Sequence, residues 1–199
     1  AAEAGDDLIT VVNGNNIIAG GAGADTITTT DGVDIILGDN GQIVWSALGV
    51  IESVTATDLT NGTDDIIIAG DADNIIVGAT GNDVIETGID NDTILGDGGV
   101  ALYNAGVLVS LSSDAAEAGD DLITVVNGNN IIAGGAGADT ITTTDGVDII
   151  LGDNGQIVWS ALGVIESVTA TDLTNGTDDI IIAGDADNII VGATGNDVI

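Results

Sequence analysis

Residues 20–28 read GGAGADTIT, and this stretch decides the fold. Gly20, Gly21 and Gly23 allow backbone conformations with positive φ, so they predict a tight turn. The TIT that follows predicts a short strand, which points Ile27 to one side and both threonines to the other. A turn and a strand together use nine residues, so two such units close one flattened coil of 18 residues.

The same period of nine recurs along the chain. Asp or Asn returns every nine residues, and an isoleucine follows each of them two positions later. One series is Asp7, Asn16, Asp25 and Asp34, and the next is Asp65, Asn74, Asp83 and Asp92. Internal repeats of this kind are typical of solenoids, whose coils stack in parallel register. We therefore predict an all-β fold, a parallel β-roll or β-solenoid of nonapeptide repeats with an isoleucine ladder inside it.

A longer repeat of 114 residues contains these series. Residues 115–199 copy residues 1–85 without a single difference. The first unit, 1–114, consists of β-roll blocks at 5–41 and 62–99 with spacers at 42–61 and 100–118, and 115–199 is a partial second unit. Because the copy stops at Ile199, inside an expected strand, we expect a longer array.

The spacers predict β-hairpin modules that interrupt the roll. Each spacer holds two apolar runs around a glycine, Gly49 or Gly106. We favour the interpretation that they cap and join the roll blocks over one in which they make lateral contacts. The residue before each core isoleucine should face outward, and an apolar outward face needs cover from the hairpins or from another chain. These outward residues are Leu8, Ile17, Ile35, Ile66, Ile75 and Val84, with threonine at positions 26 and 93.

The charge balance requires cations from outside the chain. The chain has 33 acidic residues and no Lys, Arg or His, which gives a formal net charge of −33. Self-repulsion on this scale opposes a compact state, yet the 44% hydrophobic content argues against disorder. Nucleic acid is excluded as a partner because its binding needs basic residues. Membrane insertion is not expected, since no apolar run approaches the length of a spanning helix.

Stacked carboxylates predict calcium sites. Asp25 should lie one coil above Asp7, and Asp34 one coil above Asn16, at a strand spacing of about 4.8 Å. Carboxylates this close repel each other unless a cation lies between them. Carboxylate and carbonyl oxygens favour Ca²⁺, and the absence of His and Cys argues against zinc. The predicted metal ligands are Asp7, Asn16, Asp25, Asp34, Asp65, Asn74, Asp83, Asp92, Asp121, Asn130, Asp139, Asp148, Asp179, Asn188 and Asp197.

The motif itself resembles a known family. Residues 20–28 match G-G-x-G-x-D-x-U-x in full, and residues 78–86, GATGNDVIE, match with alanine at the second position. The chain thus resembles the RTX, or hemolysin-type, calcium-binding repeat proteins, of the kind found in giant repetitive bacterial surface proteins. The resemblance implies a parallel β-roll, calcium in the turns and a bacterial type I secretion route to the cell surface or medium. Asn at positions 16, 74, 130 and 188 departs from the pattern, and all four positions should lie on one edge of the roll. We expect that edge to bind calcium more weakly, because each site there loses a formal charge.

The sequence favours a structural or a ligand-binding function over catalysis. The chain has no His, Cys or Lys to act as base or nucleophile, so we predict that it is not an enzyme. The main hypothesis is a structural calcium-binding segment of an extracellular fibre, stalk or matrix protein, rigidified by Ca²⁺ and self-associating into a fibre or array. The alternative is a ligand-binding adhesin or ice-binding module. A glycan stays open as a partner, because Asn61, Asn91 and Asn175 fit the N-glycosylation sequon.

Overall fold

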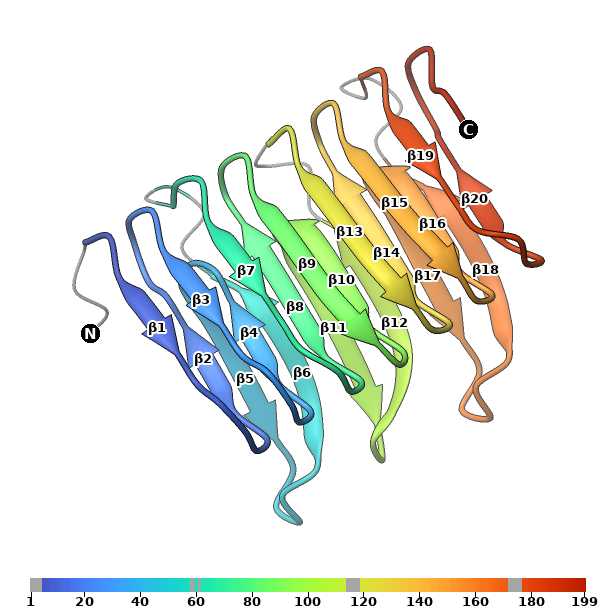
Figure 1. Ribbon diagram of the computed structural model, residues 1–199. Coiled ribbons are helices and arrows are strands. Elements are labelled where there is room, and N and C mark those ends of the chain that lie inside the picture. The colour runs from blue at the N-terminus through green and yellow to red at the C-terminus, as the bar shows by residue number, and fades with distance from the viewer. Residues whose placement is uncertain (1–4, 58–59, 61, 114–118, 172–176) are drawn as a thin grey trace.

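The chain folds into a solenoid of stacked β-coils with hairpins along one side, shown in Figure 1. The computed structural model describes residues 5–57, 60, 62–113, 119–171 and 177–199. These residues form strands and turns and contain no helix, so none of them makes a helix that could cross a membrane. The all-β prediction is therefore confirmed.

Two parallel sheets of seven strands each form the roll. In what we call the open sheet the strands are β1 (Leu8–Thr10), β3 (Thr26–Thr28), β7 (Ile66–Ile68), β9 (Val84–Ile89), β13 (Leu122–Asn127), β15 (Thr140–Asp145) and β19 (Ile180–Ile182). In what we call the covered sheet they are β2 (Ile17–Ala19), β4 (Ile35–Leu37), β8 (Ile75–Ala79), β10 (Thr93–Asp97), β14 (Ile131–Gly135), β16 (Ile149–Asp153) and β20 (Ile189–Val191). The chain alternates between the sheets, so each coil contributes one strand to each.

The register is the one that the period of nine predicts. Ile9 pairs with Ile27 in the open sheet, and Ile18 pairs with Ile36 in the covered sheet. The register also continues across the first spacer, because Ile36 pairs with Ile76. The two predicted roll blocks are therefore one uninterrupted solenoid, and the spacers leave it and return without breaking the stack.

Isoleucines fill the space between the two sheets. The largest fully buried side chains of this core are Ile27, Ile36, Ile67, Ile76, Ile85, Ile94, Ile123, Ile132, Ile141 and Ile150. Burial of each such side chain stabilises the fold by about 1.5–3 kcal/mol. The β-branched side chain suits a strand, and one residue type at every level gives a continuous ladder along the roll.

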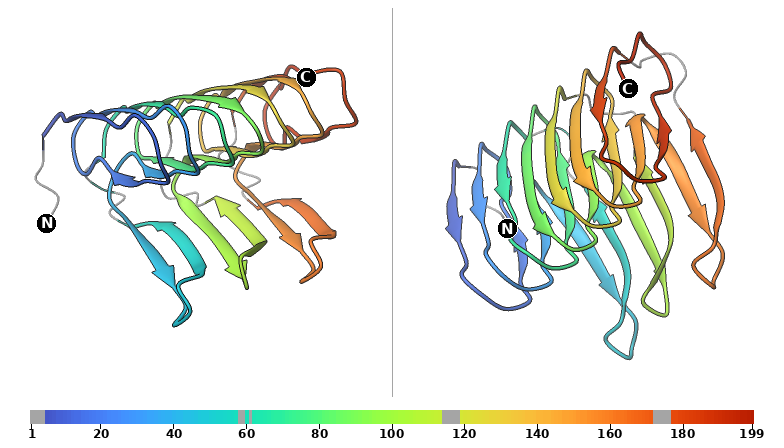
Figure 2. Two further views of the ribbon diagram at one scale, coloured as in Figure 1. Left: turned by 60° about the horizontal axis from the view of Figure 1, so that its bottom comes forward. Right: turned by 45° about the vertical axis from the view of Figure 1, so that its right-hand side comes forward.

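The spacers form hairpins, as predicted, but they lie along the side of the roll and do not cap its ends. Their strands are β5 (Gly41–Trp45), β6 (Ile51–Ala56), β11 (Gly99–Asn104), β12 (Val107–Ser113), β17 (Gly155–Trp159) and β18 (Ile165–Ala170). Neighbouring hairpins pair with each other, which gives a six-stranded antiparallel sheet, the hairpin sheet. Figure 2 shows the three hairpins projecting from the same side of the roll.

The hairpin sheet covers the outer face of the covered sheet. Leu37, Leu95 and Leu151 of the roll form a second core with Leu111 and Ile157 of the hairpins, and all five are buried. This contact makes the exposure of the predicted outward residues differ between the two faces of the roll.

Ile35 is 5% exposed beneath the hairpin sheet, and Ile75 packs against the same core. Leu8 and Ile66, on the open sheet, are 78% and 42% exposed. The hairpins thus cover most of one face and leave the other bare, while Ile17 at the first strand of the covered sheet stays 58% exposed.

Candidate calcium sites

The predicted ligands gather in two rows, one along each edge of the roll. Turns that lead into the open sheet form the first edge, with Asp7, Asp25, Asp65, Asp83, Asp121, Asp139, Asp179 and Asp197. Turns that lead into the covered sheet form the second edge, with Asn16, Asp34, Asn74, Asp92, Asn130, Asp148 and Asn188. The structure therefore stacks all fifteen predicted residues, and it adds pairs across the spacers that the period of nine does not reveal.

A hydrogen-bond ladder joins the members of each row. On the first edge, the N–H of Asp7 donates to Oδ1 of Asp25 at 2.7 Å, and that of Asp65 donates to Oδ1 of Asp83 at 2.7 Å. Across the spacer, the N–H of Asp25 donates to Oδ1 of Asp65 at 2.7 Å. Each Oδ1 is satisfied in this way by the coil below, and only Oδ2 is left to bind something else.

On the first edge, Oδ2 faces no donor. The Oδ2 atoms of six of these residues are buried and make no hydrogen bond among the described residues: Asp25, Asp65, Asp83, Asp121, Asp139 and Asp179. A buried carboxylate oxygen without a partner is strongly unfavourable. Six buried carboxylate oxygens without a hydrogen-bond donor, at successive coils, fit a cation that several oxygen atoms bind together.

The glycines beside these oxygens leave room for that ligand. A β-carbon placed on Gly78 would overlap Oδ2 of Asp83 and the carbonyl oxygen of Gly96. The same holds for Gly20, which lies against Oδ2 of Asp25 and the carbonyl oxygen of Gly38. Each cradle therefore brings a carboxylate oxygen and a carbonyl oxygen from the next coil together, two acceptors with no proton between them.

Electrostatics on this edge are unfavourable without a cation. Burial, together with repulsion from Asp121, raises the pKa of Asp83 to about 10. Burial and the carboxylate of Asp121 also raise the pKa of Asp139 to about 10. Burial raises the pKa of Asp65 and of Asp179 to about 7. Two ionised carboxylates about 4.8 Å apart repel by about 3 kcal/mol at an effective dielectric constant of about 20.

Ca²⁺ fits these cradles. It takes 6–8 hard oxygen ligands at about 2.3–2.6 Å in an adaptable geometry, whereas Mg²⁺ demands a tight octahedron and keeps its waters. No three acidic side chains lie together, in the part of the chain that the structure describes, so as to hold a metal ion by themselves. Each ion therefore needs turn carbonyls such as that of Gly96 in addition to Oδ2 of an aspartate.

The second edge is electrostatically milder. Its row alternates between Asn and Asp, so the ladder neighbours of Asp92 are the neutral Asn74 and Asn130. Burial raises the pKa of Asp92 only to about 6, because the Thr87 hydroxyl and the amide groups of Asn74 lower it.

Three further buried aspartates were not predicted from the sequence. Asp39, Asp97 and Asp153 stand where the hairpins leave the roll, and they are 1%, 0% and 2% exposed. Oδ2 of Asp39 accepts hydrogen bonds from the N–H and the hydroxyl of Thr80 on the next coil, at 3.1 and 2.6 Å. Thr194 binds Asp153 in the same way.

These aspartates thus tie the start of each hairpin to the coil above it. Their sequence signal is the Gly-Asp pair that ends each half-unit, at 38–39, 96–97 and 152–153, outside the nine-residue column. The predicted sequon residue Asn91 lies exposed in a second-edge turn, while Asn61 and Asn175 lie outside the described residues.

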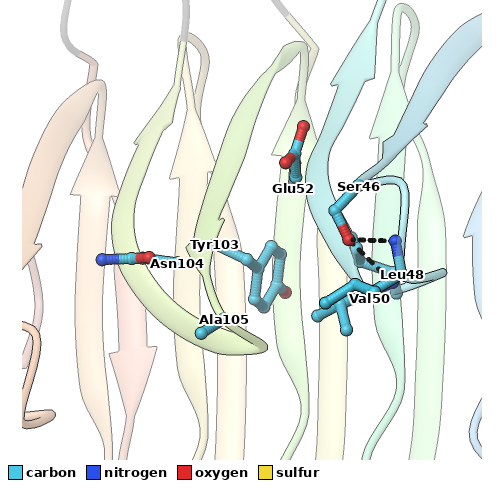
Figure 3. A pocket seen from close by; sticks show the side chains of 8 residues that line it. Ser46, Leu48, Val50, Glu52, Tyr103, Asn104 and Ala105 are labelled. Carbon is cyan, nitrogen blue, oxygen red and sulfur yellow. Dashed lines mark hydrogen bonds between the residues drawn. The ribbon is translucent and has the colours of Figure 1, made fainter.

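A pocket of about 360 Å³ lies between the first two hairpins. Figure 3 shows Tyr103 on one side of it and Ser46, Leu48 and Val50 on the other. Its remaining lining residues are Ile51, Glu52, Asn104 and Ala105. The Ser46 hydroxyl accepts the N–H groups of Leu48 and Val50, which holds the hairpin tip in place.

A parallel β-roll with a row of oxygen cradles along its edge defines a calcium-binding solenoid. The chain belongs to the RTX calcium-binding nonapeptide repeat family, whose profile matches in four copies at residues 10–42, 68–100, 124–156 and 174–199. This confirms the family resemblance, the β-roll and Ca²⁺ as the bound ion. RTX repeat proteins are typically secreted, and the repeats are typically structural. Comparison with curated proteins and with solved structures finds no match.

Proposed function

We propose that this chain is a structural segment of an extracellular repetitive fibre, stalk or matrix protein, which Ca²⁺ makes rigid. The observation that carries the proposal is the row of buried, partnerless Oδ2 atoms on the first edge. An ion at each level would join successive coils and cancel their repulsion, so stiffness would extend along the whole solenoid. A single binding or catalytic site does not need the same arrangement at every coil.

The same feature supports secretion by a bacterial type I route. Calcium is scarce in the cytosol and abundant outside, and a solenoid that needs calcium would stay unfolded until it leaves the cell. The chain has no His, Cys or Lys, and its buried carboxylates repeat from coil to coil, so we also propose that it has no catalytic activity.

The direct test is folding against calcium. Far-UV circular dichroism in EGTA should show an unfolded chain, and millimolar Ca²⁺ should restore the β-spectrum, whereas millimolar Mg²⁺ should not. Small-angle scattering in calcium should then report a rigid rod. A chain that is fully folded in EGTA would contradict the proposal.

Self-association through the open sheet is the second part of the proposal. The outward side chains on either side of the inward isoleucine of each strand are Leu8, Thr10, Thr26, Thr28, Ile66, Ile68, Val84, Glu86, Leu122, Thr124, Thr140, Thr142, Ile180 and Ile182. Glu86 is the one charge in this set, in a chain with 33 acids and no bases. A second copy of the chain can therefore approach this face without strong like-charge repulsion, and the face of the copy offers the same mixture of apolar side chains and threonines.

Light scattering in calcium across a range of concentrations tests this contact. Leu122→Glu places a charge on the open sheet and should abolish association. Gln156→Glu adds the same charge to an exposed position on the hairpin sheet and serves as the matched control. A strictly monomeric parent protein, or equal effects of the two substitutions, would refute a contact through the open sheet.

The pocket between the hairpins supports a second candidate function, a ligand-binding adhesin. Its apolar walls and its few polar groups, among them Tyr103 and Glu52, suit a neutral ligand such as a glycan. Calorimetric titration with neutral oligosaccharides should give binding that Tyr103→Ala removes, and no heat with any of them would end this candidate. Ice binding is less well supported, because Ile66 and Ile68 interrupt the threonines of the open sheet. A lack of freezing-point hysteresis would exclude it.

A further inference from the structure

The two edges of the roll differ at the position that lies beside the ladder side chain. On the first edge this position is a glycine. Gly20, Gly78, Gly134 and Gly192 come five residues before Asp25, Asp83, Asp139 and Asp197, and Gly38, Gly96 and Gly152 lie beside Oδ2 of Asp65, Asp121 and Asp179 across the spacers. On the second edge the residue five positions before each ladder residue carries a side chain: Val11, Thr29, Ala69, Thr87, Val125, Thr143 and Ala183. On the first edge a β-carbon there would overlap the aspartate Oδ2. The cradle that glycine leaves open on one edge is therefore filled on the other.

The residue that fills the position matches the ladder residue that follows. Valine or alanine comes before each Asn, and threonine comes before each Asp. The Thr143 hydroxyl donates to Oδ2 of Asp148 at 2.7 Å. In the two corresponding turns, the hydroxyls of Thr29 and Thr87 and the Oδ2 atoms of Asp34 and Asp92 are buried and make no hydrogen bond among the described residues. Thr143 thus supplies the second oxygen of Asp148 with a proton in place of a cation, and Thr29 and Thr87 bring a hydroxyl to the same sequence position in the other two turns.

The asparagines close their turns with their own amides. Nδ2 of Asn74 donates to the carbonyl oxygens of Gly70 at 3.1 Å and Ala72 at 2.8 Å. The amide cannot be turned round, because Oδ1 of Asn74 accepts the N–H of Asp34 at 3.0 Å. The amide nitrogen donates to the turn carbonyl oxygens that a cation would need, and the positive end of the amide dipole repels a cation.

The other asparagines of the second edge repeat this arrangement. Nδ2 of Asn130 donates to the carbonyl oxygen of Gly128 at 3.1 Å and to Oδ1 of Asp148 at 3.0 Å. Nδ2 of Asn188 donates to the carbonyl oxygen of Gly184 at 3.1 Å.

We propose that calcium binds along the first edge only, and that side-chain amides and hydroxyls close the second edge without any ion. This inference rests on the proposed calcium-dependent function and sharpens it. Charge alone predicts that the second edge binds calcium more weakly, whereas its closed turns predict that it binds no calcium. The roll would have one rigid, calcium-dependent edge and one edge that is held together by the protein itself.

Calcium stoichiometry tests the inference. After equilibrium dialysis at saturating calcium, elemental analysis should find about six ions per chain, one for each partnerless Oδ2 on the first edge. About twice that number would overturn the one-edge inference and leave the proposed function intact. No bound calcium would refute the proposed function itself.

Variants separate the two edges. Asp83→Asn should lower the count by one. Asn74→Asp should add no ion while Ala69 fills the position, and the double variant Asn74→Asp with Ala69→Gly should add one. An extra ion in the single variant would overturn the steric part of the inference.

A measurement on Asn74→Ala does not depend on counting ions. The loss in its urea midpoint should be the same at saturating calcium and at a tenfold higher concentration, because no ion is lost with the amide. A loss that grows with calcium would place an ion in this turn and overturn the inference.

Discussion

Asp83→Asn should change stability by an amount that depends on calcium. Asp83 is 1% exposed and lies between Asp65 and Asp121 in the first-edge row. Asparagine keeps Oδ1, so the 2.7 Å hydrogen bond from the N–H of Asp65 survives. The substitution removes only the second carboxylate oxygen and its charge, which are the features assigned to calcium.

In EGTA the variant should be more stable than the parent protein. Burial, with repulsion from Asp121, raises the pKa of Asp83 from 3.8 to about 10, so at pH 7 the folded chain holds a proton that the unfolded chain has lost. Over the roughly three pH units between 3.8 and 7, at 1.36 kcal/mol for each unit, this costs about 4 kcal/mol. Asparagine is neutral in both states and avoids that cost.

In calcium the advantage should disappear. The parent protein gains stability from its ion by about 1.4 kcal/mol for each tenfold rise in calcium above the dissociation constant, and the variant lacks this gain. The two proteins should therefore be equally stable about three decades above that constant, and the variant should be less stable beyond it.

The assay is urea denaturation followed by circular dichroism at pH 7, in a series of calcium buffers. Trimethylamine N-oxide can bring the transition of the calcium-free chain into range. Asp90→Asn, which removes one charge from an exposed position, is the matched control and should show little dependence on calcium. A stability difference that does not change with calcium would show that Asp83 is no ligand, and a variant less stable than the parent in EGTA would refute the argument from burial.

Three further predictions follow from the same structure. In EGTA the free energy of unfolding should fall as pH rises from about 4, through the raised pKa of Asp65 near 7 and towards that of Asp139 near 10, because the folded state holds protons that the unfolded state releases. Saturating calcium should flatten this profile in pH-dependent denaturation. Ile76→Ala in the isoleucine ladder should lower the free energy of unfolding by about 2–5 kcal/mol at any calcium concentration, and a smaller loss would mean that the core is loosely packed. Ala72→Gly should raise it by about 1 kcal/mol, because Ala72 has a φ of 111°; a loss of stability in thermal denaturation would contradict that account.

Much of this structure follows from the sequence because the repeat is local. A period of nine with isoleucine two residues after Asp or Asn determines coil length, strand register and which side chains point inward, since neighbouring coils can match their ladders in only one way. The pairing of Ile9 with Ile27 is a direct consequence. The excess of acids over bases likewise requires a cation, and oxygen ligands select calcium.

The place of the spacers was decided only by the tertiary structure. Each hairpin is recognisable from its two apolar runs, but its position depends on packing between Leu111 and the outer face of the roll, for example at Leu95. Nothing in a nine-residue period says which of two similar apolar faces a hairpin will cover. The role of Asp39 in tying a hairpin to Thr80 is non-local for the same reason.

The difference between the two edges also needed the folded chain. The sequence reveals Asn74 and Asp83 as members of the same repeat, and their charges alone suggest weaker and stronger calcium ligands. Only the folded turns show that the Asn74 amide already binds the carbonyl of Ala72, while Oδ2 of Asp83 faces a cradle with no donor. Residue type sets what a side chain can bind, but the direction of each turn carbonyl, which the three-dimensional fold determines, decides whether an ion or the protein itself binds it.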